Sequence, residues 1–190
     1  ITNSAGASLT RILNFDTYLD DNLVIEGEDY NFGGGKFIDN PRGQDQPNPS
    51  NNYWDQVAID ETDLHDVTEE FTSSDAFRFD SAGTIEANDI VRSKFVNFPD
   101  FDFALTNVED GEWVNYTRTI PASPDGFSLV ARLDSGGSFE AQVDLVSDPA
   151  SSNPTLTKIG TFSGGSTGGY AYVHLLDDDG NNASFMGGGV

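Results

Sequence analysis

The chain has 190 residues, enough for one domain of ordinary size, and 36% of them are hydrophobic, with 14 phenylalanines, which is too apolar for a disordered acidic chain. Aspartate and glutamate outnumber lysine and arginine by 32 to 9, giving a formal net charge of -23, and so acidic a surface repels nucleic acid and anionic membranes. The lack of cysteine excludes disulfides, thiolate zinc sites and cysteine nucleophiles.

No apolar run approaches the ~18 residues of a membrane-spanning helix, and the chain does not begin with a signal-like segment. We therefore expect neither a membrane span nor a retained signal peptide. The acidic surplus suits cations and neutral ligands. It also occurs as a plain solvated surface in proteins from salty water, and composition leaves both interpretations open.

The first segment is ambiguous in its periodicity. Leu9, Ile12 and Leu13 fall at helical spacing, whereas Leu13 and Phe15 alternate as in a strand. From Leu23 onward, short apolar segments between Gly, Asn, Asp and Pro clusters predict strands.

The first predicted strand is Leu23 to Tyr30, in which Glu26 and Glu28 occupy alternate positions and so share one face. Two like charges there require either a cation or solvent, and an exposed edge strand explains them as well as calcium does. Residues 33–56 are rich in turn-forming residues and predict a long ordered loop. Tyr53 and Trp54 either pin this loop to the core or face a ligand.

Alternating apolar and polar residues predict half-buried antiparallel strands near residues 112–120, 127–134 and 138–147, joined as a meander. Phe162 and residues 170–176 extend the pattern. Many short strands with turns between them are typical of an all-β sandwich or barrel. The side chains expected to face the core are Val114, Tyr116, Leu129, Ala131, Phe139 and Val143.

Signatures of catalysis are absent from the sequence. His65 and His174 have neither a nucleophile motif nor paired-histidine metal spacing nearby. Acidic residues are so abundant that some pair of carboxylates would lie at the spacing of a glycosidase by chance, so such a pair is not evidence of catalysis. Residues 177–182 (DDDGNN) do not match an EF-hand loop and predict a polar hairpin turn. We expect a protein that is not an enzyme.

Four motifs occur in the order typical of family 6 carbohydrate-binding modules, which the chain resembles over residues 23–190. The segment Ile25 to Tyr30 (IEGEDY) resembles that family's opening strand, and Asp110 to Thr117 (DGEWVNYT) resembles its central Gly-Glu-Trp-x-x-Tyr strand. The remaining two matches are residues 127–138 (FSLVARLDSGGS) and residues 156–170 (LTKIGTFSGGSTGGY).

The resemblance implies a secreted, non-catalytic jelly-roll β-sandwich of short antiparallel strands with long loops, which binds polysaccharide. It implies Ca²⁺ near the first strand, with Glu26 and Glu28 at the family's carboxylate positions. The resemblance also implies that such a module is attached to polysaccharide-degrading or polysaccharide-holding domains, such as a glycoside hydrolase, in a longer parent protein.

In this family two aromatic rings enclose a sugar and an amide fixes its hydroxyls. The resemblance places Tyr170 at one ring position, but Asn107 replaces the second ring. The family's last strand, which supplies the amide, has no counterpart before Val190. We expect a changed cleft in which Tyr170 and Asn107 contact the sugar, with Trp54 and Tyr53 as further candidates.

Residues 1–22 precede the resemblance and could donate a strand to another copy of the chain, because a sandwich lacking its last strand exposes a sheet edge. The alternative function is therefore a structural or adhesive subunit of an extracellular assembly or filament that uses the same fold and strand donation between copies.

Overall fold

The structure is a computed structural model. It describes residues 23–39, 41, 52–67, 77–78, 83–87, 103–149, 151 and 153–186. Throughout these ranges the secondary structure is strand, turn and bend without helix, so the all-β class is confirmed. No described residue belongs to a helix long and apolar enough to cross a membrane.

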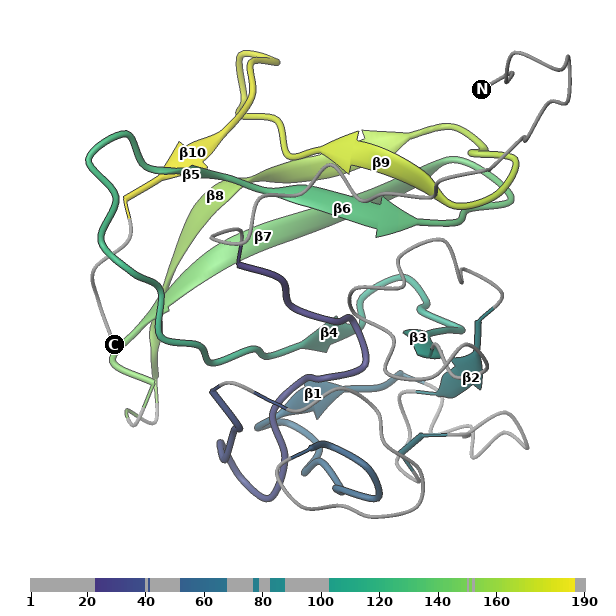
Figure 1. The fold of residues 1–190 in the computed structure, drawn as a ribbon, viewed down its shortest axis with the longest axis vertical. Helices are drawn as coiled ribbons and strands as arrows, with labels where there is room; N and C mark the ends of the chain where they lie inside the picture. The colour runs from purple at the N-terminus through teal and green to yellow at the C-terminus, as the bar shows by residue number, and fades with distance from the viewer. Residues whose placement is uncertain are drawn as a thin grey trace, which may run out of the picture. The chain divides into compact units, whose positions relative to one another are not determined.

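Ten strands are described, and they pair antiparallel two by two (Figure 1). The strands are β1 (Leu64–His65), β2 (Thr84–Glu86), β3 (Phe103–Leu105), β4 (Trp113–Val114), β5 (Phe127–Ser128), β6 (Val130–Leu133), β7 (Phe139–Ser147), β8 (Thr155–Gly164), β9 (Ala171–His174) and β10 (Ser184–Phe185). The pairs are β1–β4, β2–β3, β10–β5, β6–β9 and β7–β8.

The chain divides into two compact units, an N-terminal unit (Ile1–Arg118) and a C-terminal unit (Thr119–Val190). The sequence resemblance runs across both units, so the prediction of a single module over residues 23–190 stays a prediction. The N-terminal extension, residues 1–22, lies outside the described residues.

The N-terminal unit has an aromatic core. Phe77 stacks on Phe103 with ring centroids 5.0 Å apart, and Trp54 meets Phe77 edge-on at 5.6 Å. Tyr53 completes the buried set, and Phe32 packs edge-on against it at 5.6 Å. Offset and edge-to-face ring pairs of this kind stabilise a core beyond the area that they bury.

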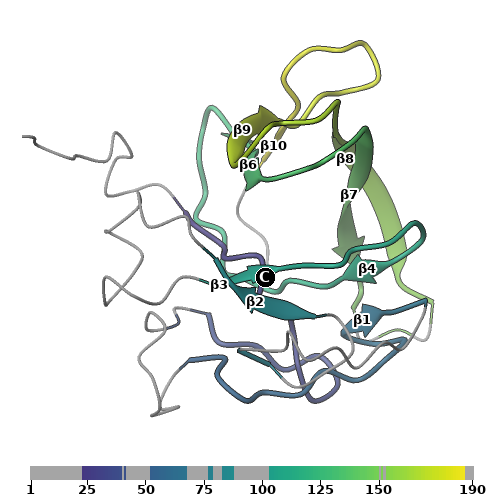
Figure 2. The ribbon, with the colours of Figure 1, turned by 90° about the vertical axis from the view of Figure 1, so that its right-hand side faces the viewer.

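In the C-terminal unit the longest element is the β7–β8 hairpin, visible as two long curved strands in Figure 2. A register irregularity between Val143 and Asp144 marks a bulge. The residues directly after β9 lie against β8, because Thr161 and Leu176 exchange two backbone hydrogen bonds of 2.8 and 3.0 Å. Leu175 and Ala183 are the buried apolar residues of this unit.

The prediction of a meander was wrong, although its strands β6 and β7 lie where the alternation indicated. β6 pairs with β9, and β7 pairs with β8. The turn after β6 is bonded to Thr167, whose backbone N–H donates to the Ser135 carbonyl at 2.9 Å and whose Oγ1 accepts from the Ser135 N–H at 2.8 Å.

The side chains expected in the core are less buried than predicted. Tyr116 is 38% exposed, and the other five are only half-buried. The alternation correctly located strands such as β7, but the fully buried residues belong largely to loops and short strands that the pattern did not single out.

Candidate functional site

The segment predicted as the first strand is a turn. The Asp29 N–H donates to the Glu26 carbonyl at 3.1 Å, which closes a β-turn over residues 26–29. Glu26 and Glu28 are therefore not two positions on one strand face. Glu28 and Asp29 are buried, at 1% and 6% exposure, while Glu26 is half-buried.

Arg78, which is fully buried, holds this turn and the residues after it. Its guanidinium donates to the carbonyls of Glu28 (3.4 Å), Asn31 (2.9 Å) and Tyr30, and its Nε donates to the Gln56 carbonyl at 3.0 Å. The guanidinium carbon lies 3.6 Å from the centroid of the Tyr30 ring, within the range of a cation–π contact.

Arg118 supplies a second buried guanidinium at the same turn. It donates to the Asp29 carbonyl at 2.9 Å and to the Tyr53 hydroxyl at 2.9 Å. Sequence reasoning missed both arginines. The available signal was that each follows an aromatic residue by one or two positions in a chain with only nine basic residues.

The carboxylates of the turn influence one another. Burial raises the pKa of Asp29 to about 7; the positive charge of Arg118 opposes this shift, and the negative charge of Glu26 adds to it. Burial also raises the pKa of Tyr116, with further contributions from Glu28 and Asp29. The Tyr116 ring is partly exposed, but its hydroxyl donates to the Gly27 carbonyl at 2.6 Å.

The turn bears on the calcium expectation through the ligand atoms that it offers. Three carboxylates in four residues are hard oxygen ligands of the type that Ca²⁺ takes, and they outnumber the two guanidinium groups beside them. The Asp29 and Glu28 carbonyls, however, already accept hydrogen bonds from the arginines. Among the described residues, the metal-ligating atoms that lie close enough together to share an ion belong to Asp60, Glu61 and His65, so calcium at the Glu26 and Glu28 carboxylates stays a prediction.

Of the predicted aromatic contacts, Tyr53 and Trp54 belong to the core of the N-terminal unit. Tyr53 is 0% exposed; its hydroxyl accepts from the Ile38 N–H at 2.7 Å and contacts the Ile38 carbonyl at 3.1 Å. Trp54 is half-buried against Phe77 and Phe103. Tyr53 therefore pins its loop and has no ring face open to a sugar.

Asn107 and Tyr170 belong to different units. Asn107 is exposed, two residues after β3, with a φ of 56°, a left-handed conformation that asparagine tolerates better than most residues. Tyr170 is half-buried and directly precedes β9.

Tyr170 lies beside an aromatic and cationic face of the β6–β9 pair. Arg132 on β6 is in register with Tyr172 on β9, and Val130 is in register with His174. The Arg132 guanidinium carbon lies 4.7 Å from the Tyr172 ring centroid and 5.7 Å from that of Tyr170. Tyr172 is 47% exposed and Val130 42% exposed.

We call Tyr170, Arg132 and Tyr172 the tyrosine–arginine face. Successive strand residues point to opposite sides, so Ala131, Leu133, Ala171 and Val173 occupy the other side of the pair. Sequence reasoning singled out Tyr170 but missed its two neighbours. The alternation of aromatic residues in residues 170–172 (YAY) was the available signal.

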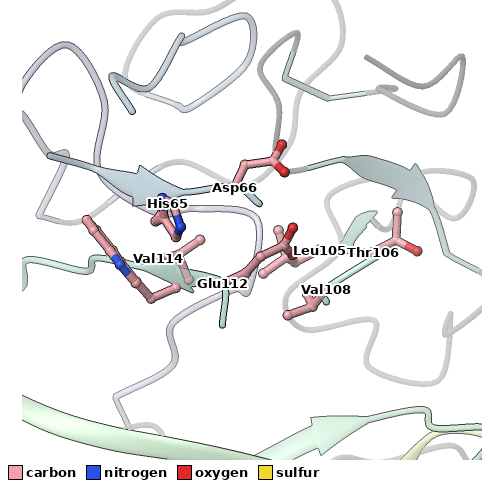
Figure 3. Close-up of a pocket in the computed structure, with 8 residues that line it drawn as sticks. His65, Asp66, Leu105, Thr106, Val108, Glu112 and Val114 are labelled. Carbon is pink, nitrogen blue, oxygen red and sulfur yellow. The ribbon is translucent and has the colours of Figure 1, made fainter. Parts of the chain in front are cut away.

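A pocket in the N-terminal unit is too small for a sugar. Its volume is about 30 Å³, room for a water molecule or two, whereas small-molecule sites enclose about 300–1,000 Å³. His65 and Val114 line one side, and Thr106 and Val108 line the other (Figure 3).

Comparison of the chain with protein-family models, with curated proteins and with solved structures gave no significant match.

Proposed function

We propose that this protein is a secreted, non-catalytic carbohydrate-binding module that binds polysaccharide through the tyrosine–arginine face of β6–β9. The observation that carries the proposal is the guanidinium of Arg132 close to the rings of both Tyr170 and Tyr172 at the β6–β9 pair. The jelly-roll β-sandwich implied by the resemblance is part of the proposal, and the antiparallel strand pairs support it.

The chemistry of this face suits a pyranose. The C–H faces of sugar rings pack on aromatic rings, and a guanidinium is a planar group that donates hydrogen bonds to hydroxyls. Because Arg132 is in direct register with Tyr172, the donors and the stacking ring lie side by side on a two-stranded element. An open face of this kind suits the side of an extended polysaccharide rather than an enclosed small sugar.

The negative charge of the chain selects among glycans. With a formal net charge of -23, the long-range field disfavours heavily sulfated or uronic-acid-rich polymers. Neutral polysaccharides are therefore the expected ligands. Calcium held by Glu26 and Glu28 belongs to the same proposal as a structural ion of the N-terminal unit.

A glycan array with the full chain tests the proposal. Wild-type protein should bind one or more neutral glycans, and Tyr172→Ala should bind them about tenfold more weakly or worse, as expected for the loss of roughly 1.4 kcal/mol of stacking and burial. Phe37→Ala removes a ring that is 39% exposed in the N-terminal unit and should bind as wild type does. Equal binding by wild type and Tyr172→Ala would contradict the proposal.

A further inference from the structure

Three metal-ligating side chains meet on one short loop of the N-terminal unit. His65 Nδ1 lies 3.0 Å from Glu61 Oε1 and 3.8 Å from Asp60 Oδ1. One ligand atom from each of the three side chains lies within 4.8 Å of the others. The side chains of Asp60 and Glu61 are 48% and 70% exposed, so an ion can reach them directly from solvent.

The histidine nitrogen that faces the carboxylates is within ion-pair distance of Glu61 but has no hydrogen bond of good geometry among the described residues. Nδ1 of His65 is shielded from solvent and makes no hydrogen bond with any described residue, although a carboxylate oxygen lies 3.0 Å away. A polar atom in this situation costs free energy unless a partner satisfies it. A metal ion between the nitrogen and the two carboxylates would satisfy all three groups at once.

The loop is held in place by groups other than the three ligands. The buried carboxylate of Asp63 accepts backbone N–H bonds from Gly34 (2.8 Å), Gly35 (2.5 Å) and Ile59 (2.9 Å). The His65 ring stacks on Trp113, with centroids 6.2 Å apart and planes 29° from parallel. The imidazole is therefore oriented before any ion binds, which reduces the entropy lost on binding.

We propose that Asp60, Glu61 and His65 form a site for a first-row divalent transition-metal ion, with Zn²⁺ as the main candidate. Imidazole and carboxylate ligands suit zinc, at about 2.0–2.2 Å from the metal. A tetrahedron with such bonds places its ligand atoms roughly 3.3–3.6 Å apart, between the two observed distances of 3.0 and 3.8 Å. Small rotations of two exposed side chains complete the site.

This site differs from the proposed calcium site in its chemistry. Calcium takes oxygen ligands at 2.3–2.6 Å, and a histidine nitrogen is not among them. Three protein ligands leave the fourth position of a zinc tetrahedron to water. The site also shares no residue with the proposed glycan-binding face, because all of its residues belong to the N-terminal unit.

Calorimetric titration of the full chain with Zn²⁺ in chelator-treated buffer tests the proposal. Wild type should bind Zn²⁺ at a site that His65→Ala lacks and that Glu61→Gln weakens at least about tenfold. Glu61 is exposed, so this second variant does not threaten folding. His174→Ala removes the other histidine of the chain and should bind Zn²⁺ as wild type does.

A fluorescence titration with Cu²⁺ provides a local readout, because the His65 ring stacks on Trp113 and Cu²⁺ quenches nearby tryptophan. Quenching should disappear in His65→Ala and in Trp113→Phe, while Trp113→Phe should still bind Zn²⁺ in calorimetry. Three results would overturn the proposal and leave only a histidine–carboxylate ion pair. They are unchanged Zn²⁺ binding by His65→Ala, displacement of Zn²⁺ by an equal concentration of Ca²⁺, and no Zn²⁺ binding at all.

Discussion

Arg78 shows at the scale of a single residue how a scarce positive charge organises an acidic chain. Its guanidinium satisfies backbone carbonyls of Glu28, Tyr30, Asn31 and Gln56, which lie 22 to 50 residues away in sequence. A buried charge is costly unless it is fully hydrogen-bonded. The Arg78 guanidinium donates to these carbonyls and also lies against the face of the Tyr30 ring. The conformation of residues 28–31 therefore depends on one side chain.

Replacing Arg78 with methionine should be strongly destabilising. The variant leaves three buried carbonyls and the part-buried Gln56 carbonyl without their donor, and we expect the free energy of unfolding to fall by about 3–5 kcal/mol, measured by chemical denaturation. Lys158→Met is the matched control, since Lys158 makes an exposed ion pair with Asp178, and such pairs contribute little. Equal denaturation midpoints for the two variants would contradict this role of Arg78.

Asp29 should make stability depend on pH. Its pKa rises on folding from 3.8 to about 7, so the folded state holds the proton more tightly than the unfolded state does. The contribution of Asp29 to stability is therefore fully present below about pH 4 and is lost as pH rises towards 7 and beyond, by at most about 1.4 kcal/mol per pH unit.

The Asp29→Asn variant, measured with chelator present, should lose this part of the pH dependence. Its stability should exceed that of wild type increasingly between pH 4 and pH 7. Denaturation curves that keep a constant separation between the two proteins across this range would show that Asp29 does not titrate there.

At the scale of structural elements, the turn at Glu26–Asp29 is the proposed calcium-binding element. A cation at Glu26 and Glu28 would offset the mutual repulsion of the carboxylates, and because it binds only the folded state it should add about 2.7 kcal/mol of stability at 100 times its Kd. Thermal unfolding with Ca²⁺ should therefore occur at a higher temperature than with chelator, and Glu28→Gln should lose the difference. A Tm that does not change beyond the effect of equal ionic strength would refute the calcium proposal.

Gly160 in β8 is required by a close approach of backbone. A Cβ atom at this position would lie 2.5 Å from the Leu176 carbonyl oxygen, next to the Thr161–Leu176 hydrogen bonds. Gly160→Ala should therefore destabilise the C-terminal unit by about 1–3 kcal/mol. Gly136→Ala is the control, because a Cβ there meets no atom within 4 Å; if the two variants unfold at the same denaturant concentration, this packing argument fails.

At the scale of the whole molecule, local patterns predicted local structure and missed long-range contacts. The alternation from Phe139 to Leu145 correctly indicated β7, and the polar residues 177–182 form the expected tight turn, with the Asp177 carboxylate accepting from the N–H groups of Asp179 and Asn181. Such features depend on neighbours in the sequence.

Partners distant in sequence could not be predicted in this way. The pairing of β1 with β4 joins Leu64 to Val114. Arg78 and Arg118 hold the turn at residues 26–29 and the residues after it, where a strand was predicted. Of the proposed glycan-binding face, Tyr170 was identified from the resemblance, but Arg132 became part of it only through the cross-strand register with Tyr172.

The most direct test of the account is to map a bound glycan onto the protein by NMR. After a binding glycan has been identified on the array, ¹H–¹⁵N spectra of the full chain should be recorded during titration. The account predicts that the largest shift changes occur in β6 and β9, at Arg132, Tyr172 and neighbouring Tyr170, and that Tyr172→Ala abolishes them. Largest changes among residues of the N-terminal unit, with β6 and β9 unaffected, would contradict it.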